Sequence, residues 1–270
     1  IDPVCDRPVY LTGDISSNDL GAVAGVMIPP EDFLQGFFDE PGLLMVSEAT
    51  NGGRDALRSR EEEYAELMFR VNEVRSREGV SLIPTFAAGR TSDIAKALLR
   101  AGITPWVDGM ARNLIGIEAP ELLFGKGVNL VPFGKEGRLV REVVVRTPGN
   151  VIIASSGSLE GGTAVHYAER ILPGRENAVF FVGHIFNKTV AEKLLNIERG
   201  HTIRLPDFEN EEGIIVNVRS DIYRFDFSAH DYRSALAERV RRVFGACVAR
   251  GGSRGTCIVH HIGESNGVDG

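Results

Sequence analysis

The chain has 270 residues, of which 43% are hydrophobic, and a formal net charge of -7. This content supports a sizeable core and excludes a largely disordered protein, while the length suits one large domain or two ordinary ones. The acidic balance excludes a histone-like protein that binds nucleic acid by bulk charge. Three cysteines without CxxC spacing indicate a reduced, cytoplasmic protein. No apolar run approaches the ~18 residues of a membrane span.

Strand-like and helix-like patterns alternate along the chain, which predicts an α/β fold with largely parallel sheets. The predicted strands are 8–12, 43–47, 80–83, 105–108, 143–145, 151–154, 178–182, 214–218 and 256–259. The predicted helices are 61–78, 92–99, 163–171, 188–196 and 232–244.

Short polar motifs follow the strands near both ends of the chain, whereas the middle has its own alternation of strands and helices. We therefore expect a domain at 54–199 inserted into an outer domain made of 1–53 and 200–270. The chain starts without methionine and reaches a strand within eight residues. This start indicates a piece of a longer protein.

Two carboxylates stand at the ends of the first two predicted strands. Asp14 follows Gly13, whose backbone permits a tight turn that points the carboxylate at a metal. The alternative is a turn aspartate that bonds its own backbone. Glu48 is placed to orient a histidine by accepting its N–H. The alternative is a surface glutamate at a strand end.

Three histidines are candidates for the chemistry. His230 directly precedes a predicted helix, where an imidazole serves either as a general acid or as a helix cap. His260 and His261 end the last strand, and neutral imidazole is a common zinc ligand. Neighbours in a strand point to opposite faces, so at most one of this pair reaches a shared site. The alternative is a polar strand end.

A Ser/Gly-rich turn joins the predicted strand 151–154 to a helix, and Ser155, Ser156 and Gly157 are its candidates for phosphate contacts. Free N–H groups at a helix start attract phosphate, although the turn lacks a Walker A pattern. Arg90 follows another strand and offers a guanidinium suited to phosphate. The alternatives are a plain turn and a solvated arginine.

Taken in order, these segments resemble the metallo-β-lactamase-fold nucleases with a β-CASP insertion, a family that includes ribonuclease J and the cleavage and polyadenylation endonuclease. The match spans nearly the whole chain. The similar segments, with the family pattern in parentheses, are 10–14 (Y-T-G-D), 47–52 (E-S-T-Y-G), 83–90 (I-P-A-F-A-x-G-R), 107–111 (V-D-G-M-A), 154–162 (A-S-S-G-M-x-x-G-G), 227–230 (F-S-A-H) and 258–260 (L-V-H-G).

The resemblance implies part of a metallo-β-lactamase αββα sandwich with an inserted β-CASP α/β domain. It implies hydrolysis of RNA with two zinc ions, RNA as the partner, and an assembly compatible with a homodimer. By the same resemblance Asp14 bridges the zinc ions, Glu48 supports His230, and His230 protonates the leaving oxygen. His260 falls on the last zinc-ligand histidine.

The chain departs from the family in its metal ligands. The family's H-x-H-x-D-H cluster lies upstream of the first motif, whereas the first histidine here is His166. Asp14 and His260 fall short of the three or four ligands that zinc needs, so we expect a fragment of an active nuclease. Asp231 follows His230 directly, where the family has its acid two residues on. The alternatives are a non-catalytic RNA-binding scaffold subunit and a DNA-repair nuclease of the same superfamily.

Overall fold

The computed structural model describes residues 9–17, 25, 43–207, 210, 212–249 and 255–260. The chain divides into two compact units. The first unit comprises Ile1–Asp19, Ala24–Leu57 and Ser228–Gly270, and the second comprises Leu20–Val23 and Arg58–Phe227. Within the described ranges, no helix is long and apolar enough to cross a membrane.

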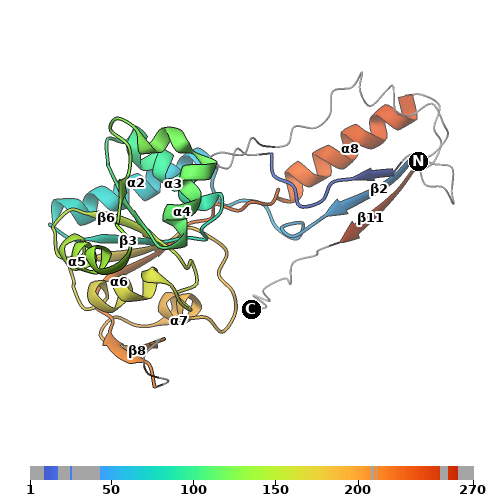
Figure 1. The fold of residues 1–270 in the computed structure, drawn as a ribbon. Helices are drawn as coiled ribbons and strands as arrows, with labels where there is room; N and C mark the ends of the chain where they lie inside the picture. Colours follow the sequence, from blue (N-terminus) through green and yellow to red (C-terminus); the bar gives the residue numbers. More distant parts are fainter. Residues whose placement is uncertain are drawn as a thin grey trace. The chain divides into compact units, whose positions relative to one another are not determined.

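The first unit contains a parallel sheet of three strands in the order β1-β2-β11. Strands β1 (Val9–Leu11) and β2 (Leu43–Glu48) come from the start of the chain, and β11 (Gly255–His260) comes from its end. Helix α8 (Arg233–Ala249) lies beside this sheet in Figure 1. The fully buried Met45 and Val243 pack between them. Apolar burial therefore joins segments that are about 200 positions apart in sequence.

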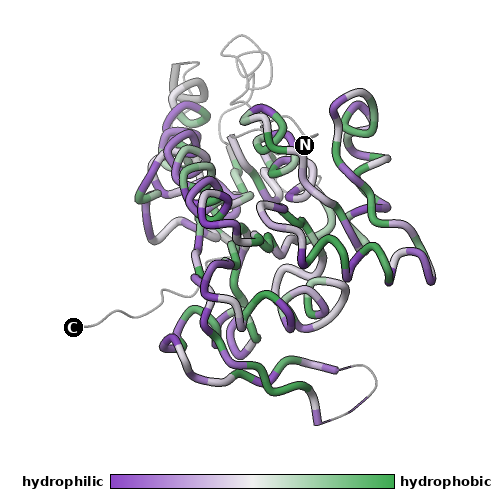
Figure 2. The backbone as a smooth tube through the Cα atoms, turned by 90° about the vertical axis from the view of Figure 1, so that its left-hand side faces the viewer, coloured by the Kyte–Doolittle hydropathy of each residue, from purple (hydrophilic) through white to green (hydrophobic). Residues whose placement is uncertain are grey.

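The second unit is built on a parallel sheet of six strands in the order β10-β7-β3-β6-β4-β5. Such a sheet is covered on both faces, which explains the continuous apolar strands. Figure 2 shows hydrophobic stretches, in green, alternating with hydrophilic stretches, in purple, along the backbone. The strands are β3 (Ser81–Pro84), β4 (Trp106–Asp108), β5 (Asn129–Leu130), β6 (Val151–Ala154), β7 (Ala178–Phe181) and β10 (Asp221–Arg224), and a separate antiparallel pair is β8 (Thr202–Leu205) and β9 (Ile214–Asn217).

Helices cover both faces of this sheet and form one apolar cluster on each side (Figure 1). A capping box between Ser59 and Glu62 starts the first of them, satisfying backbone N–H groups that the helix leaves free. One side carries α2 (Arg60–Ser76), α3 (Arg90–Arg100), α4 (Met110–Glu118) and the 3-10 turn η1 (Pro120–Leu123); the other carries α5 (Gly134–Val144), α6 (Thr163–Ile171) and α7 (Val190–Asn196).

The α/β class with parallel sheets is confirmed, and one predicted strand is wrong. Residues 143–145 form the end and cap of α5. Their β-branched run is typical of a strand, but Val144 and Val145 bury against the sheet from the end of a helix. Tertiary packing therefore overrides the local preference. The predicted elements also lack α4, α5, β5, β8 and β10.

The predicted division into 1–53 with 200–270 and 54–199 stays a prediction. In the structure residues 200–227 lie with the second unit, because β10 pairs with β7 along its whole length. The parallel strands place the loops that follow them at one carboxyl edge of the sheet. Ligands of parallel α/β sheets bind at that edge.

Candidate functional site

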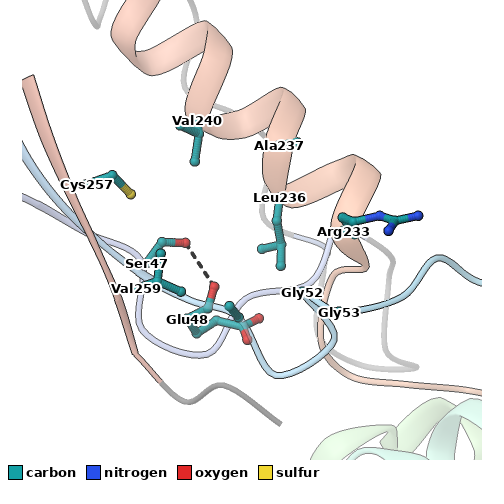
Figure 3. Close-up of a pocket in the computed structure, with 11 residues that line it drawn as sticks. Ser47, Glu48, Gly52, Gly53, Arg233, Leu236, Ala237, Val240, Cys257 and Val259 are labelled. Atoms are coloured by element: carbon teal, nitrogen blue, oxygen red, sulfur yellow. Dashed lines mark hydrogen bonds between the residues drawn. The ribbon is translucent and has the colours of Figure 1, made fainter. Parts of the chain in front are cut away.

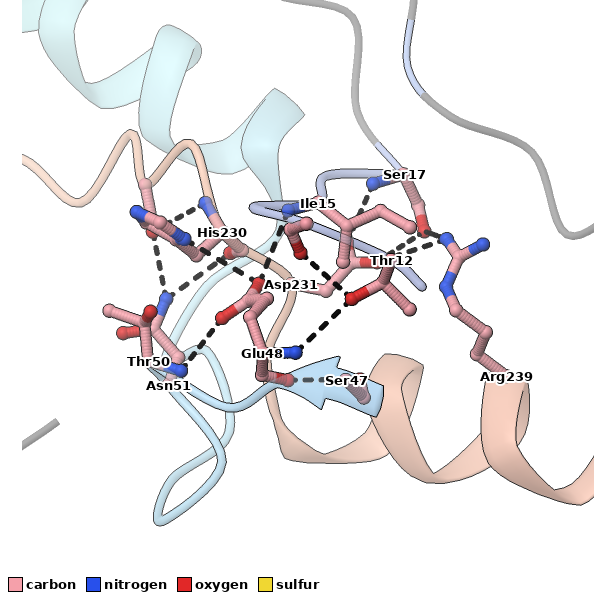
Figure 4. A network of polar contacts seen from close by, with 12 residues as sticks. Thr12, Ile15, Ser17, Ser47, Glu48, Thr50, Asn51, His230, Asp231 and Arg239 are labelled. Carbon is pink, nitrogen blue, oxygen red and sulfur yellow. Dashed lines mark hydrogen bonds and ion pairs between the residues drawn. The ribbon is translucent and has the colours of Figure 1, made fainter. Parts of the chain in front are cut away.

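A polar network surrounds Glu48 in the first unit (Figure 4). This residue ends β2, and its side chain is fully buried. Its carboxylate accepts hydrogen bonds from the backbone N–H of Thr50 at 2.7 Å and of Ile15 at 3.4 Å. Its own N–H donates to Thr12 Oγ1 at 3.1 Å. The buried carboxylate is therefore fixed by backbone donors, as a buried charge requires.

His230 meets this carboxylate from the segment before α8. Its Nδ1 lies 3.5 Å from Glu48 Oε1, longer than a strong hydrogen bond, and this nitrogen has no nearer partner in the described part of the chain. The side chain is 26% exposed, so the imidazole is mostly sheltered but still reachable from solvent. Asn51 Nδ2 donates to the carbonyl of His230 at 3.2 Å and to Ser228 Oγ at 2.8 Å. These bonds hold the backbone that presents the ring.

The neighbouring Asp231 is a buried anchor. Its carboxylate accepts from Ser17 N–H at 2.6 Å and from Ser17 Oγ at 2.8 Å. Arg239 Nη2 lies 3.3 Å from Asp231 Oδ2, and both side chains are 1% exposed. The pair therefore ties the loop after β1 to the histidine segment (Figure 4).

Sequence reasoning missed Arg239. The signal was present: this arginine shares the apolar face of α8 with Leu236 and Val243, which lie three positions before it and four after it. A charged residue on an apolar helical face implies a buried partner. The sequence shows Asp231 only as an acid displaced from the family position, and its role as that partner follows from the fold.

The two predicted metal ligands belong to the same unit. Asp14 is exposed in the loop after β1, where Gly13 adopts a φ of +58° that favours glycine. The next residue, Ile15, contacts Glu48. His260 stands opposite Glu48 in the register of β11 and β2, but its side chain lies outside the described part of the chain. His261 also lies outside the described residues.

The described residues do not by themselves fit a metal ion. Among them, no group of three or more His, Cys, Asp or Glu side chains is placed to hold one. Structural and catalytic zinc sites need three or four protein ligands. We therefore derive the chemistry of this site from Glu48 and His230 alone.

A pocket of about 430 Å³ lies between α8 and the ends of β2 and β11. Figure 3 shows Leu236 and Val240 projecting from the helix toward the strand side chains. Cys257, Val259 and Glu48 line the opposite side. Because most of its wall is apolar, this pocket is unsuited to a phosphate, and the polar chemistry belongs to the network around Glu48.

The predicted phosphate loop lies at the carboxyl edge of the sheet in the second unit. Ser155 Oγ accepts from the N–H of Met110 at 2.9 Å, which joins the loop to the start of α4. Ser156 Oγ and Thr163 Oγ1 are buried hydroxyls without a hydrogen-bond partner among the described residues. A Cβ at position 109 would lie 2.5 Å from Thr163 Oγ1, so the missing side chain of Gly109 permits the close approach of the backbone to this threonine. Unmet donors beside helix starts suit an anion.

Internal partners hold the guanidinium of Arg90. Its side chain is 9% exposed, and Nη1 pairs with Asp93 Oδ2 at 2.7 Å. Nη2 donates to the carbonyl of Phe227, and burial lowers the pKa of the guanidinium. Tyr64 donates to the same Asp93, and burial raises the pKa of Tyr64 to about 12. The first turn of α3 therefore directs Arg90 into the core, which does not support the predicted phosphate contact.

Comparisons with known proteins cover most of the chain. The Beta-Casp domain matches residues 45–194. Transcription termination factor FttA of Methanothermobacter thermautotrophicus is 30% identical over 225 residues, 74% of this chain and 34% of that protein. FttA of Thermococcus kodakarensis is 30% identical over 224 residues, with the same shares. RNase aCSPSF2 of Saccharolobus solfataricus is 30% identical over 184 residues, 64% of this chain and 35% of that protein. The chain thus spans about a third of the relatives it matches.

Proposed function

The chain belongs to the Beta-Casp domain family, and on this premise we propose that the protein carrying it hydrolyses phosphodiester bonds in RNA. The observation that carries the proposal is the approach of His230 Nδ1 to the buried Glu48 carboxylate at 3.5 Å. A relative that bears the name of an RNase supports RNA as the substrate. Asp14 and the backbone of His260 belong to the same unit as Glu48 and His230, which supports a shared site.

The geometry gives the two residues distinct roles. Glu48 cannot move freely, because backbone N–H groups of Thr50 and Ile15 hold its carboxylate. Its charge attracts the proton on Nδ1 of His230, which leaves Nε2 to face the substrate. As the oxygen of a water molecule bonds to phosphorus and the P–O bond to the leaving group breaks, a protonated imidazole donates its Nε2 proton to the leaving oxygen. A positioned general acid of this kind accelerates cleavage by ~10²- to 10⁴-fold.

The Ser155–Gly157 loop supplies the second part of the proposal. We assign it to the phosphates of the substrate, because the hydroxyl of Ser156 is buried without a partner in the described part of the molecule. Helix α6 starts beside this loop without a side-chain cap, and the N–H of Ala164 in its first turn bonds the carbonyl of Ser155 at 2.9 Å, so the positive end of the helix lies next to the loop. Zinc as the metal, a homodimer as the assembly and the cytoplasm as the location belong to the same proposal.

Replacing Asp14 by alanine in the full-length protein is expected to lower the zinc content, because the proposal makes this carboxylate a metal ligand. The measurement is elemental analysis of the purified protein, in zinc ions per chain. Glu121→Ala serves as the control, because it removes an exposed carboxylate that lies in the second unit. Full zinc occupancy in the Asp14 variant would remove this residue from the ligand set.

Competition between labelled single-stranded RNA and DNA of one sequence tests the function itself. The full-length protein is expected to cut the RNA and leave the DNA intact. Cleavage of DNA alone would favour a DNA-repair nuclease. Tight RNA binding without cleavage would favour a scaffold subunit, and either result would end the proposed RNA hydrolysis.

A further inference from the structure

Two exposed aromatic rings stand at the carboxyl edge of the six-stranded sheet. Phe133 follows β5 and is 67% exposed, and Phe186 follows β7 and is 50% exposed. Between these two strands the sheet contains β4, β6 and β3. The loop after β6 is the Ser155–Gly157 loop. An aromatic residue therefore lies on either side of the proposed phosphate contacts.

Arg112 holds the first ring. This arginine lies in the first turn of α4, and its guanidinium carbon is 3.5 Å from the centroid of Phe133. Its Nε and Nη1 are buried and have no hydrogen-bond partner within the described ranges. Stacking by a cation fixes the orientation of the ring, yet most of the ring stays open to solvent. Phe133 thus presents a rigid, flat, apolar surface at a polar edge.

Other rings hold Phe186. It meets Phe86 edge-on, with centroids 5.8 Å apart and planes at 86°, and it meets His184 at 4.7 Å and 77°. Phe86 also packs against the backbone of the phosphate loop, since a Cβ on Gly157 would lie 3.3 Å from its ring. This second surface is therefore continuous with the loop.

The spacing of the two rings fits a polymer. Neighbouring strands lie about 4.8 Å apart, so the four steps from β5 to β7 separate the strand ends by roughly 19 Å. A few nucleotides of extended single strand cover such a distance. Bases stack on aromatic side chains regardless of sequence, while a polar groove follows the backbone.

We propose that the carboxyl edge of this sheet is a track for single-stranded RNA, with bases stacked on Phe133 and Phe186 and phosphates over Ser155–Gly157. The identity of the polymer rests on the proposed function. Single strands fit because the bases of a duplex already stack on one another and are closed to side chains. Cationic or imidazole partners on both rings, and hydroxyls between them, favour RNA over a protein partner.

The test is fluorescence anisotropy with the full-length protein and a labelled, unstructured 12-nucleotide RNA, whose integrity is checked on a gel. Phe133→Ala and Phe186→Ala are each expected to weaken binding about tenfold, and the double variant about a hundredfold. Phe133→Trp should retain binding. Phe124→Ala is the matched control, because Phe124 is 74% exposed in the loop that enters β5, at the opposite edge of the sheet.

Three results would overturn the track. The first is an unchanged RNA affinity in both alanine variants. The second is a loss of RNA affinity in the Phe124 control as large as the loss in the two variants. The third is a changed oligomeric mass of the variants with an unchanged RNA affinity. A duplex of the same sequence should bind the wild type and the variants alike. Cleavage of the RNA, measured in parallel, separates the two proposals. If the alanine variants weaken binding but the protein does not cleave RNA, the track stands and the proposed hydrolysis is wrong. If the protein cleaves RNA but the alanine variants bind it normally, the hydrolysis stands and the track is wrong.

Discussion

Replacing Arg239 by methionine is expected to lower the free energy of unfolding of the first unit by about 3 to 5 kcal/mol. The side chain is fully buried, and it stands 3.3 Å from the equally buried Asp231. Methionine fills much of the same volume but leaves the carboxylate without its cation in a site closed to water. An uncompensated buried charge is among the few causes of so large a loss.

Urea unfolding followed by circular dichroism measures this loss. Arg241→Met on the same helix is the control, because Arg241 is 72% exposed and its pair with Glu238 contributes little. Its effect should stay within about 0.5 kcal/mol. Adding Asp231→Asn to Arg239→Met should recover part of the loss, since the charge that lacked a partner is gone. Equal stability of the Arg239 variant and the control would show that the buried pair contributes no net stability.

The sequence predicted what depends on short-range pattern. Strands such as 151–154 and 178–182 are continuous apolar runs, and a parallel sheet covered on both faces requires such runs. The motif at Glu48 was recognisable because it ends a strand, and the motif at His230 because it directly precedes a helix. Their pairing came from the resemblance, since no local pattern states that segments about 180 positions apart meet.

Internal side-chain partners, some of them close in sequence, decided the rest. Arg90 reads as a free cation after a strand, but Asp93 and the carbonyl of Phe227 take up its guanidinium. The pattern around Arg239 indicates an ordinary charged residue on a helix, but the fold places the buried Asp231 beside it. The carbonyl of Phe227 is 137 positions from Arg90, and the nearer Asp93 and Asp231 are identified as partners only once the directions of the side chains are known. Charged side chains at element ends are therefore poor evidence of a ligand site until their internal partners are identified.

Replacing His230 by alanine in the full-length protein is expected to slow RNA cleavage by ~10²- to 10⁴-fold, because the leaving oxygen would depart without a proton. The metal content should stay the same, since the histidine is assigned to proton donation. The readout is single-turnover cleavage of a labelled RNA, with elemental analysis of the same preparation. His201→Ala removes an exposed histidine of the second unit and should leave the rate unchanged.

Glu48→Gln separates orientation from proton donation. Glutamine keeps an oxygen 3.5 Å from Nδ1 but carries no charge to attract the ring proton. The rate should therefore fall by only ~10- to 100-fold, and the double variant with His230→Ala should be no slower than His230→Ala alone. Such non-additivity is expected only if the carboxylate acts through the imidazole. Additive losses would mean that Glu48 serves the reaction without His230, and wild-type turnover in His230→Ala would remove the imidazole from the chemistry.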